Sequence, residues 1–420
     1  MSLVDAVIPR QYRETVRGPV RRLYLATFIS CVGLGLTLSL FVVYLHDVRG
    51  FSTGFATALL ALSALVSLAV SPLWGTVTDR LGPLWAIVVG SSGNAVAIAI
   101  FAFARTEPVA LVAVALLAIF GGAGWGPSST ILGRLVDAEH RQFAFGLNFM
   151  LVNLGIGVGT LVSAVVVDLA RPVTFSVLYL VNAAVTLAAI APYARLRAHA
   201  GPSLEHHDPE RRAEGWRVVL SDRLLVRLVV ATVVLMVGGY GSQEAGFSLF
   251  VVNDLHVSVH ALGVIFFFNT TTIVVAQIAV LARIAGRSRT RVLGVVSLFW
   301  STFWLILELC LRLPAAASVA LLCAAMVVFA LGETMLSPVS SAIVNDIAPE
   351  HLRGRYNAAS GLAWSVSGTL APLVTGLYFT FHASGWWPLG TAGAALVGGA
   401  MMLSLRHHIS PAADGRVGSP

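Results

Sequence analysis

Long apolar runs alternate with short polar segments along nearly the whole chain. A run of about 20 apolar residues is long enough to cross the hydrocarbon core of a bilayer as a helix. When the chain is divided at its charged and turn-forming residues, the pattern predicts twelve such helices. They are expected at residues 23–45, 53–77, 83–104, 108–135, 144–168 and 174–194, and then at residues 225–251, 259–283, 291–311, 316–344, 355–379 and 385–404.

The predicted helices form two groups of six. They are separated by the longest polar segment, which predicts four regions: an N-terminal six-helix bundle (1–194), a cytoplasmic linker (195–224), a C-terminal six-helix bundle (225–405) and a cytoplasmic tail (406–420). A weak internal repeat supports this division, because Pro127 corresponds to Pro338 and Gly155 to Gly368. The expected fold is therefore an all-α polytopic membrane protein with two pseudo-symmetric six-helix bundles.

The arginines indicate how the helices are oriented. An even number of spans places both termini on one side, and basic residues favour the cytoplasmic side. Of the 27 basic residues, all of which are arginine, only Arg49, Arg105, Arg171 and Arg312 fall on the opposite side. We therefore expect a multi-pass protein of the cytoplasmic (inner) membrane with both termini in the cytoplasm.

Composition agrees with this class and excludes others. The chain is 57% hydrophobic and 11% charged, with a mean hydropathy of +0.84, whereas soluble domains carry about 25% charged residues. It has no lysine, which excludes a phosphate-binding loop with its essential lysine and a Schiff-base cofactor. Cys31, Cys310 and Cys323 lie in apolar runs without metal-like spacing. We expect no enzyme activity, no cofactor, no metal site and no nucleic-acid partner.

The segment "SPLWGTVTDRLGPLW" (71–85) joins the second and third predicted helices. Gly75, Asp79, Arg80 and Gly82 match the signature loop of the major facilitator superfamily, which the chain resembles over its whole length, although Pro83 and Leu84 replace a basic pair. The resemblance implies that these four residues form a conformational gate. It places Asp79 against the beginning of the eleventh helix, near 355–357, lets Gly75 bring the helices close together, and pairs Arg80 with Asp137 or a neighbouring helix end.

Two further patterns bear on the branch of the superfamily. Gly146, Gly155 and Gly159 follow the fifth-helix glycine pattern of the drug:proton antiporters, the multidrug efflux branch, although Thr160 replaces its proline. Small residues of this kind allow membrane helices to pack closely. The arginine that many proton-coupled exporters carry early in the fourth helix is missing, because 116–118 reads Leu-Leu-Ala. If protons drive transport, their coupling is organised differently here.

Two acids are predicted to lie inside the membrane, where a charge is costly and an ionisable side chain is a functional candidate. These are Glu244 and Glu333. Since burial disfavours the charged form of an acid, each can exchange protons as water access alternates. The alternative is that each acid only fixes helix packing. The uncharged and aromatic candidates for the substrate cavity, chosen with the cavity-lining helices that the resemblance implies, are Trp125, Tyr240, Gln243, Asn269 and Gln277.

The resulting hypothesis is a secondary active transporter that works by alternating access, most simply a proton-coupled exporter of drugs or of hydrophobic or cationic metabolites. Its expected partners are a small-molecule substrate, protons and the lipid bilayer, and it is expected to be a monomer. Two alternatives stay open: an importer or facilitator of a nutrient in the same superfamily, and a transporter-like sensor or assembly protein. A lipid flippase is a variant of the first hypothesis.

Overall fold

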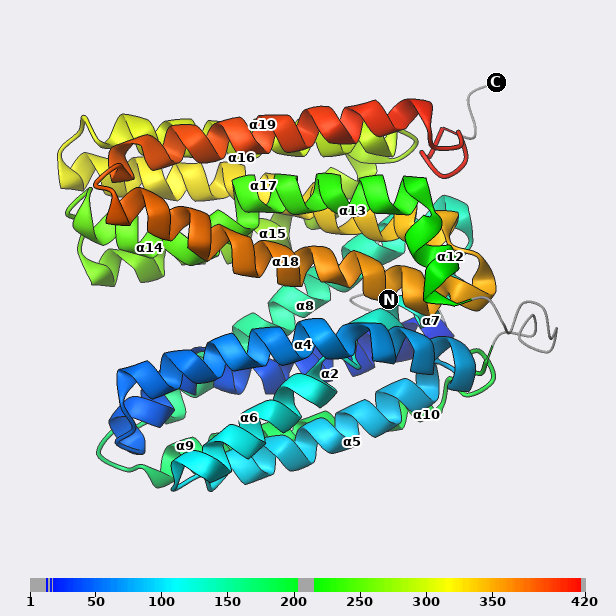
Figure 1. The fold of residues 1–420 in the computed structure, drawn as a ribbon, viewed down its shortest axis with the longest axis horizontal. Coiled ribbons are helices and arrows are strands. Elements are labelled where there is room, and N and C mark those ends of the chain that lie inside the picture. The colour runs from blue at the N-terminus through cyan, green and yellow to red at the C-terminus, as the bar shows by residue number, and fades with distance from the viewer. Residues whose placement is uncertain (1–12, 14–15, 17, 203–214, 417–420) are drawn as a thin grey trace. The chain divides into compact units, whose positions relative to one another are not determined.

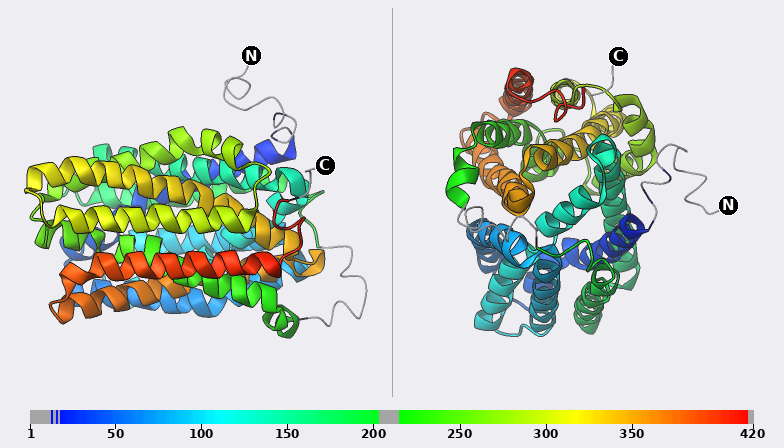
Figure 2. Two further views of the ribbon diagram at one scale, coloured as in Figure 1. Left: turned by 90° about the horizontal axis from the view of Figure 1, so that it is seen from above. Right: turned by 90° about the vertical axis from the view of Figure 1, so that its right-hand side faces the viewer.

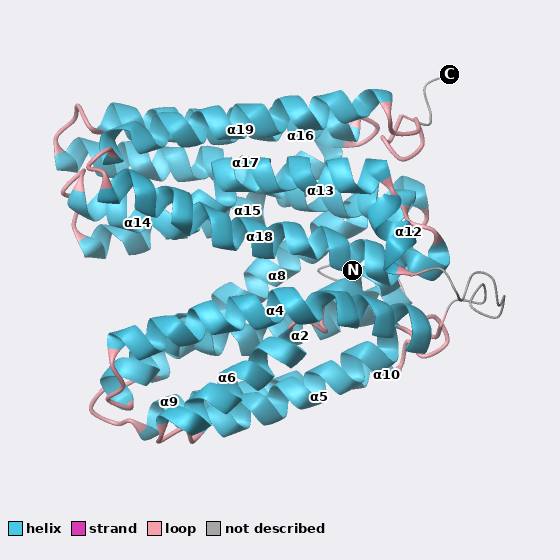
Figure 3. Ribbon diagram, viewed as in Figure 1, coloured by secondary structure: helices cyan, strands magenta, loops and turns pink. Residues whose placement is uncertain are grey.

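The computed structural model describes residues 13, 16, 18–202 and 215–416. Within these residues the regular secondary structure is helical throughout, as Figure 3 shows. Twelve of the described helices, some of them interrupted, are long and apolar enough to cross a membrane. The predicted all-α polytopic fold is therefore confirmed.

The chain forms two compact units, each a bundle of helices. Unit 1 comprises residues 1–137, 151–215 and 348–359. In it α5 packs against α6 and α9, and α4 packs against α5 and α6 (Figure 1). Its elements are α2 (Pro19–Thr37), η2 (Leu38–Leu40), α3 (Phe41–Val43), η3 (Tyr44–Val48), α4 (Thr53–Leu81), α5 (Pro83–Ala102), α6 (Glu107–Gly121), α7 (Trp125–Leu135), α9 (Val173–Ala188), α10 (Ile190–Ala194) and η6 (Glu350–Leu352).

Unit 2 comprises residues 138–150, 216–347 and 360–420. In it α16 packs against α17 and α19, and α15 packs against α17; Figure 2 gives two further views of the helices. Its elements are α12 (Trp216–Ser221), α13 (Arg223–Met236), η5 (Val237–Gly241), α14 (Ser242–Asn253), α15 (Val259–Ile284), α16 (Arg289–Cys310), α17 (Ala315–Ile347), η7 (Ser384–Trp386), α19 (Trp387–Ser404) and η8 (Leu405–His407).

Two long helices are divided between the units. Helix α8 (Ala138–Val166) begins in unit 2 and continues in unit 1, whereas α18 (Arg353–Thr380) begins in unit 1 and continues in unit 2. The predicted division at residues 194 and 225 does not include this exchange, and the bundle boundaries stay a prediction. Of the predicted linker, residues 203–214 lie outside the described residues, and Trp216–Ser221 form the short helix α12.

Several helix ends differ from the predicted ones. The prediction ended helices at charged residues, but charged side chains can also occupy the terminal turns of a helix that are in contact with water. Helix α4 extends to Leu81, so Asp79 and Arg80 lie in its last turn and not in the loop that was predicted. Helix α8 begins at Ala138, six residues before the predicted start. The predicted fourth helix is broken between α6 and α7 at residues 122–124 (Gly-Ala-Gly), where the two glycines lower helix propensity.

Helices α2 and α8 approach each other within unit 1 so closely that only glycine fits. A Cβ atom on Gly35 would lie 2.2 Å from the carbonyl oxygen of Ile156, and one on Gly159 would lie 2.2 Å from the carbonyl oxygen of Val32. On Gly155 it would lie 2.8 Å from the Cβ atom of Cys31.

The remaining glycine of the fifth-helix pattern lies in unit 2. A Cβ atom on Gly146 of α8 would lie 2.5 Å from the side chain of Leu281 of α15. The fifth-helix glycines therefore sit where α8 packs against neighbouring helices.

Replacing Gly159 by alanine is expected to lower the free energy of unfolding by about 1–3 kcal/mol, because the added methyl group must displace backbone atoms in a packed region. Thermal unfolding of the purified protein in detergent measures the loss. Gly376→Ala in α18 is the matched control, since no atom lies within 4 Å of its added Cβ atom. Equal melting temperatures for the two variants would contradict the close approach of α2 and α8.

Candidate functional site

Asp79, in the last turn of α4, is held by the beginning of α18. Its side chain is only 1% exposed. Its carboxylate accepts hydrogen bonds from the backbone N–H groups of Gly354 (2.7 Å) and Arg355 (3.1 Å), and the Arg355 Nη1 atom lies 3.4 Å from its Oδ2 atom. The first N–H groups of a helix have no partner within the helix and carry partial positive charge. A carboxylate at this position is therefore stabilised by the helix end and by the guanidinium together.

Glycines on both sides make this contact possible. A Cβ atom on Gly75 would lie 2.7 Å from the Cβ atom of Ala358, and one on Gly354 would lie 2.5 Å from Oδ1 of Asp79. Gly82, the single residue between α4 and α5, has a φ of 91°, a conformation that glycine adopts readily and other residues rarely. Pro83 then begins α5, where its lack of an N–H group costs nothing. We call Asp79 and its partners Gly354 and Arg355 the α4–α18 contact.

Of the two partners expected for Arg80, Asp137 does not bind it in the described part of the chain, and a neighbouring helix end stays a prediction. Arg80 is exposed. Successive residues of a helix point about 100° apart, so Arg80 lies on a different face of α4 from Asp79. The neighbouring contacts come from α7 instead: Arg134 Nε lies 3.7 Å from Glu350 Oε1, and Asn357 Nδ2 donates to Thr130 Oγ1 (3.3 Å).

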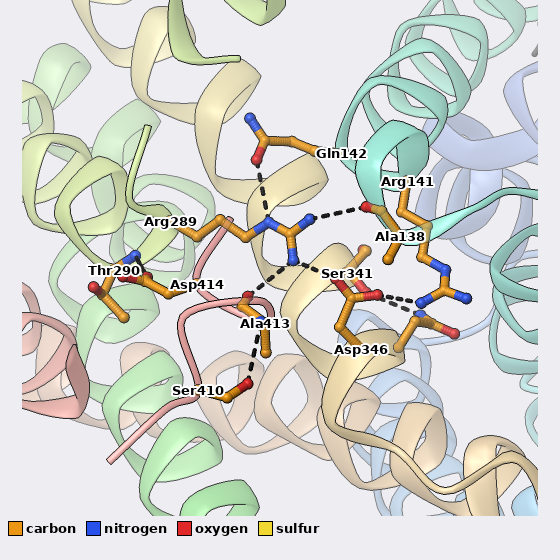
Figure 4. Close-up of polar contacts among 11 residues, drawn as sticks. Ala138, Arg141, Gln142, Arg289, Thr290, Ser341, Asp346, Ser410, Ala413 and Asp414 are labelled. Carbon is orange, nitrogen blue, oxygen red and sulfur yellow. Dashed lines mark hydrogen bonds and ion pairs between the residues drawn. The ribbon is translucent and has the colours of Figure 1, made fainter. Parts of the chain in front are cut away.

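Unit 2 contains a second ionic cluster, which the sequence did not predict (Figure 4). Asp346, near the end of α17, forms ion pairs with Arg141 of α8 and with Arg289 of α16, the latter at 2.5 Å. Arg289 Nη2 also donates to the carbonyl oxygen of Ala138 (3.4 Å), and its Nε donates to Gln142 Oε1 (3.3 Å). The cluster therefore joins α16, α17 and the beginning of α8. The residues were visible in the sequence as charges at predicted helix ends, but their pairing was not.

The C-terminal tail is part of this cluster and not simply a solvated extension. Asp414 is fully buried. Its carboxylate accepts hydrogen bonds from the Ser288 hydroxyl (2.7 Å) and the Thr290 backbone N–H group (2.9 Å), and Arg289 Nη1 donates to the carbonyl oxygen of Ala413 (2.9 Å). Asp414 therefore caps the beginning of α16 from a position more than a hundred residues along the chain.

We expect Asp414→Ala to lower the free energy of unfolding by about 1–2 kcal/mol, the usual cost of losing a helix cap. The measurement is thermal unfolding of the full chain in detergent. Asp137→Ala serves as control, because Asp137 precedes α8 as its N-cap residue, is exposed and makes no capping hydrogen bond with its side chain. If the two variants unfold at the same temperature, the tail does not stabilise α16.

Glu333 of α17 lies within a candidate membrane span and is only 6% exposed. Its Oε2 atom accepts a hydrogen bond from Asn269 Nδ2 of α15 (2.6 Å). Two turns further along α15, Gln277 donates to the carbonyl oxygen of Thr334 (2.9 Å) and is fully buried. Among the described residues no basic side chain forms an ion pair with Glu333. Two of the predicted cavity residues thus lie beside one of the predicted acids.

Glu244 follows an irregular turn of its helix. The π-helical segment η5 separates α13 from α14 three residues before Glu244, and such turns occur frequently at functional sites. The carboxyl group of Glu244 interacts with the Tyr240 hydroxyl, and the Tyr240 ring packs edge-on against Trp364 of α18, with ring centroids 5.1 Å apart. Tyr240 also interacts electrostatically with Glu333. The two predicted acids therefore share Tyr240 as a neighbour, and we call Glu244 and Glu333 the acid pair.

Tight packing explains why η5 contains glycines. A Cβ atom on Gly239 would lie 1.8 Å from the ring of Trp300, and one on Gly238 would lie 2.2 Å from the backbone nitrogen of Ala395. The indole N–H group of Trp304 donates to the carbonyl oxygen of Gly238 (2.7 Å). The irregular turn is therefore held in place by α16 and α19, and it positions Tyr240 and Glu244.

Among the described residues, neither of the two remaining predicted cavity residues, Gln243 and Trp125, forms a hydrogen bond with Glu333, in contrast to Asn269. Gln243 is buried, although it is adjacent to the exposed Glu244, and Trp125 at the beginning of α7 belongs to unit 1 and is 51% exposed. In the described part of the chain no group of three or more His, Cys, Asp or Glu side chains is arranged to hold a metal ion. The chemistry available at the acid pair is therefore proton exchange and the binding of a cation or a hydrogen-bond donor.

Comparison with known proteins identifies relatives along most of the chain. The sequence model of the Major Facilitator Superfamily matches residues 23–251 and 229–418. A Na(+), Li(+), K(+)/H(+) antiporter of Planococcus maritimus is 23% identical over 357 residues, covering 77% of this chain and 81% of that protein. The quinolone resistance protein NorA of Staphylococcus aureus is 22% identical over 410 residues, covering 92% of this chain and 96% of that protein.

The fold is shared with solved transporter structures. A structure of the Major Facilitator Superfamily transporter FucP in the outward conformation superimposes with a TM-score of 0.75 and 12% identity, covering 92% of this chain and 99% of that one. At this identity the similarity concerns the fold alone.

Proposed function

This chain belongs to the Major Facilitator Superfamily, and we propose that within it the protein works as a proton-coupled exporter of hydrophobic or cationic organic molecules. As a transporter of this superfamily it is an integral multi-pass membrane protein and not an enzyme. For its orientation we propose that both termini lie in the cytoplasm and that the protein sits in the cytoplasmic membrane, because the arginines concentrate on the segments of that side. We propose a monomer that binds its small-molecule substrate and protons.

The buried carboxyl group of Glu333 is the observation that carries this proposal. An ionisable group in the membrane is costly, and this one has an amide partner, Asn269, but no cationic one among the described residues. The Glu333 carboxyl group can bind a proton, and a cationic substrate that reaches the carboxylate can bind there instead. A proton and a cation can therefore compete for the same group. Glu244, next to Tyr240, supplies a second acid on the proton route.

For the conformational cycle we propose that the α4–α18 contact and the Asp346 cluster act as gate contacts. Helices α8 and α18 each begin in one unit and continue in the other. Movement of one half against the other, as in alternating access, must therefore strain or break the contacts at the beginnings of these helices. We propose that Gly75, Asp79 and Gly82 form this gate. Arg80 contributes less to it, because it is exposed and does not pair with Asp137.

The relatives favour export and proton exchange, and they also favour a second candidate function. The name of the Staphylococcus protein records quinolone resistance, and that of the Planococcus protein records exchange of alkali cations for protons. If the acid pair of this chain takes inorganic cations, the second candidate is alkali-cation/proton exchange. Both candidates use the same acids, and they differ in the size and polarity of the cation.

Everted membrane vesicles with an acidic interior test the proposal. A fluorescent lipophilic cation is expected to accumulate in vesicles that contain the protein, and to leave when nigericin collapses the pH gradient. Vesicles without the protein are the control. Accumulation that survives collapse of the gradient, or that matches the control, would overturn proton-coupled export. A rise in internal pH on addition of NaCl or KCl, with no effect of the organic cation, would establish the second candidate instead.

A further inference from the structure

A groove of about 900 Å³ in unit 2 is lined by residues of α15, α16 and α17, together with the segment between α15 and α16 and Arg416. Most of its wall is apolar: α15 contributes Ala276 and Val280, α16 contributes Val292 and Val295, and α17 contributes Leu331 and Met335. All three helices are candidate membrane spans. We call this feature the α15–α16 groove.

One end of the groove is strongly basic. It is lined by Arg283, Arg287, Arg291 and Arg416, and no acidic side chain is among the described residues that line it. The first three arginines are exposed, and none of them forms an ion pair with a described residue. Arg283 uses one donor on the carbonyl oxygen of Ala279 in its own helix (3.1 Å), which leaves most of its guanidinium donors available.

Asp414, the acid that pairs with Arg416, does not neutralise this end. Asp414 is fully buried and bonded to Ser288, Thr290 and Arg416, whose Nε atom lies 2.7 Å from its Oδ2 atom. One carboxylate therefore offsets only one of the four arginines, and the other three present their positive charge to the end of an apolar groove.

We infer that the α15–α16 groove binds an anionic phospholipid, with the phosphate at Arg283, Arg287 and Arg291 and the acyl chains against the apolar wall. Basic pockets between membrane helices accept anionic head groups, and arginine matches phosphate with paired hydrogen bonds. A soluble anion would leave the apolar wall uncovered. A cationic substrate would meet three arginines with no acid to balance them. The inference is independent of the direction of transport and of its substrate.

The charge at the site is tested with the triple variant Arg283→Gln, Arg287→Gln, Arg291→Gln of the full chain, purified in a neutral detergent. Native mass spectrometry is used to count bound phosphatidylglycerol, and phosphatidylcholine is the neutral reference. Affinity for phosphatidylglycerol is expected to fall on the order of a hundredfold, since each basic residue contributes about fivefold near an anionic lipid. The control removes three other exposed arginines, Arg195, Arg197 and Arg217, and is expected to change the affinity by less than about threefold.

The apolar wall is tested separately with Val280→Trp, which fills the groove without changing its charge. The control is Val275→Trp, on the same helix, at a position that is 74% exposed and outside the groove. Added phosphatidylglycerol is expected to raise the melting temperature of the wild type and of the control, but not of Val280→Trp or of the triple arginine variant. Protection by a bound ligand follows its occupancy, so the melting temperature reports the site even where transport is unaffected.

Three results would overturn the inference. The first is equal loss of lipid binding in the two triple arginine variants, which would show general attraction to basic charge. The second is full lipid protection of Val280→Trp, which would show that the acyl chains do not use the groove. The third is protection of the wild type by soluble glycerol phosphate equal to that by phosphatidylglycerol, which would show a site for a free anion.

Discussion

Replacing Asp79 by asparagine is expected to reduce transport by at least a hundredfold while leaving the protein in the membrane at normal levels. Asparagine has the same size as aspartate, so the close packing of α4 and α18 around Gly75 and Gly354 is retained. The change removes the negative charge that two backbone N–H groups and the Arg355 guanidinium surround. It also places an amide, with donors of its own, against groups that only donate.

The size of the effect follows from the burial of Arg355. This side chain is 2% exposed, and removing one partner of a buried ion pair costs about 3–5 kcal/mol, because the other charge is left without compensation. A difference of that size shifts a two-state equilibrium by more than about a hundredfold. Any conformation that keeps the α4–α18 contact is therefore depopulated, and a cycle that must return to it is interrupted.

Initial transport rates in vesicles with matched protein content measure the effect. Asp137→Asn, which changes the exposed aspartate at the N-cap position of α8, is the control and is expected to transport at the wild-type rate. Double replacement of Asp79 by Asn and Arg355 by Gln is expected to recover part of the activity, since no buried charge is then left alone. If Asp79→Asn transports at the wild-type rate, the α4–α18 contact is not needed for transport and the gate proposal is wrong.

Replacing Glu333 by glutamine is expected to abolish uptake driven by a pH gradient. Glutamine keeps the size of glutamate, and its carbonyl oxygen can still accept the hydrogen bond from Asn269 that holds Glu333 in place. The fold is therefore retained, but the group can no longer bind or release a proton. If the acid also compensates a cationic substrate, binding of that substrate weakens as well.

Glu244→Gln is expected to have the smaller effect, because Glu244 is exposed whereas Glu333 is buried. The rate with an imposed pH gradient should fall only severalfold, since water can replace part of its role in proton transfer. The control is Glu308→Gln. Glu308 is also a glutamate in a candidate membrane span, but it lies near the end of α16 and outside the acid pair. Gradient-driven uptake at the wild-type rate in both Glu333→Gln and Glu244→Gln would contradict proton coupling through these acids.

The sequence predicted the spans well because each of them depends on local composition. About twenty apolar residues in succession favour a membrane helix whatever their neighbours are. Helix ends were predicted less well, since a charged turn can either continue a helix into water or end it. In α4 the helix continues through Asp79 and Arg80, and in α8 it begins early enough to include Arg141. The acids Glu244 and Glu333 could be selected because charge is rare in apolar runs.

The sequence by itself determined the membrane class, the helical fold and a short set of polar residues whose placement inside the bilayer costs free energy. The tertiary structure decided which of these residues are neighbours: Asn269 bonds to Glu333 across 64 positions of the chain, and Gly354 bonds to Asp79 across 275. It also placed Asp414 at the start of α16 and gathered the arginines at the end of the α15–α16 groove. The physical reason is that hydropathy is a property of each segment alone, whereas a hydrogen bond or an ion pair between distant segments depends on how whole helices pack.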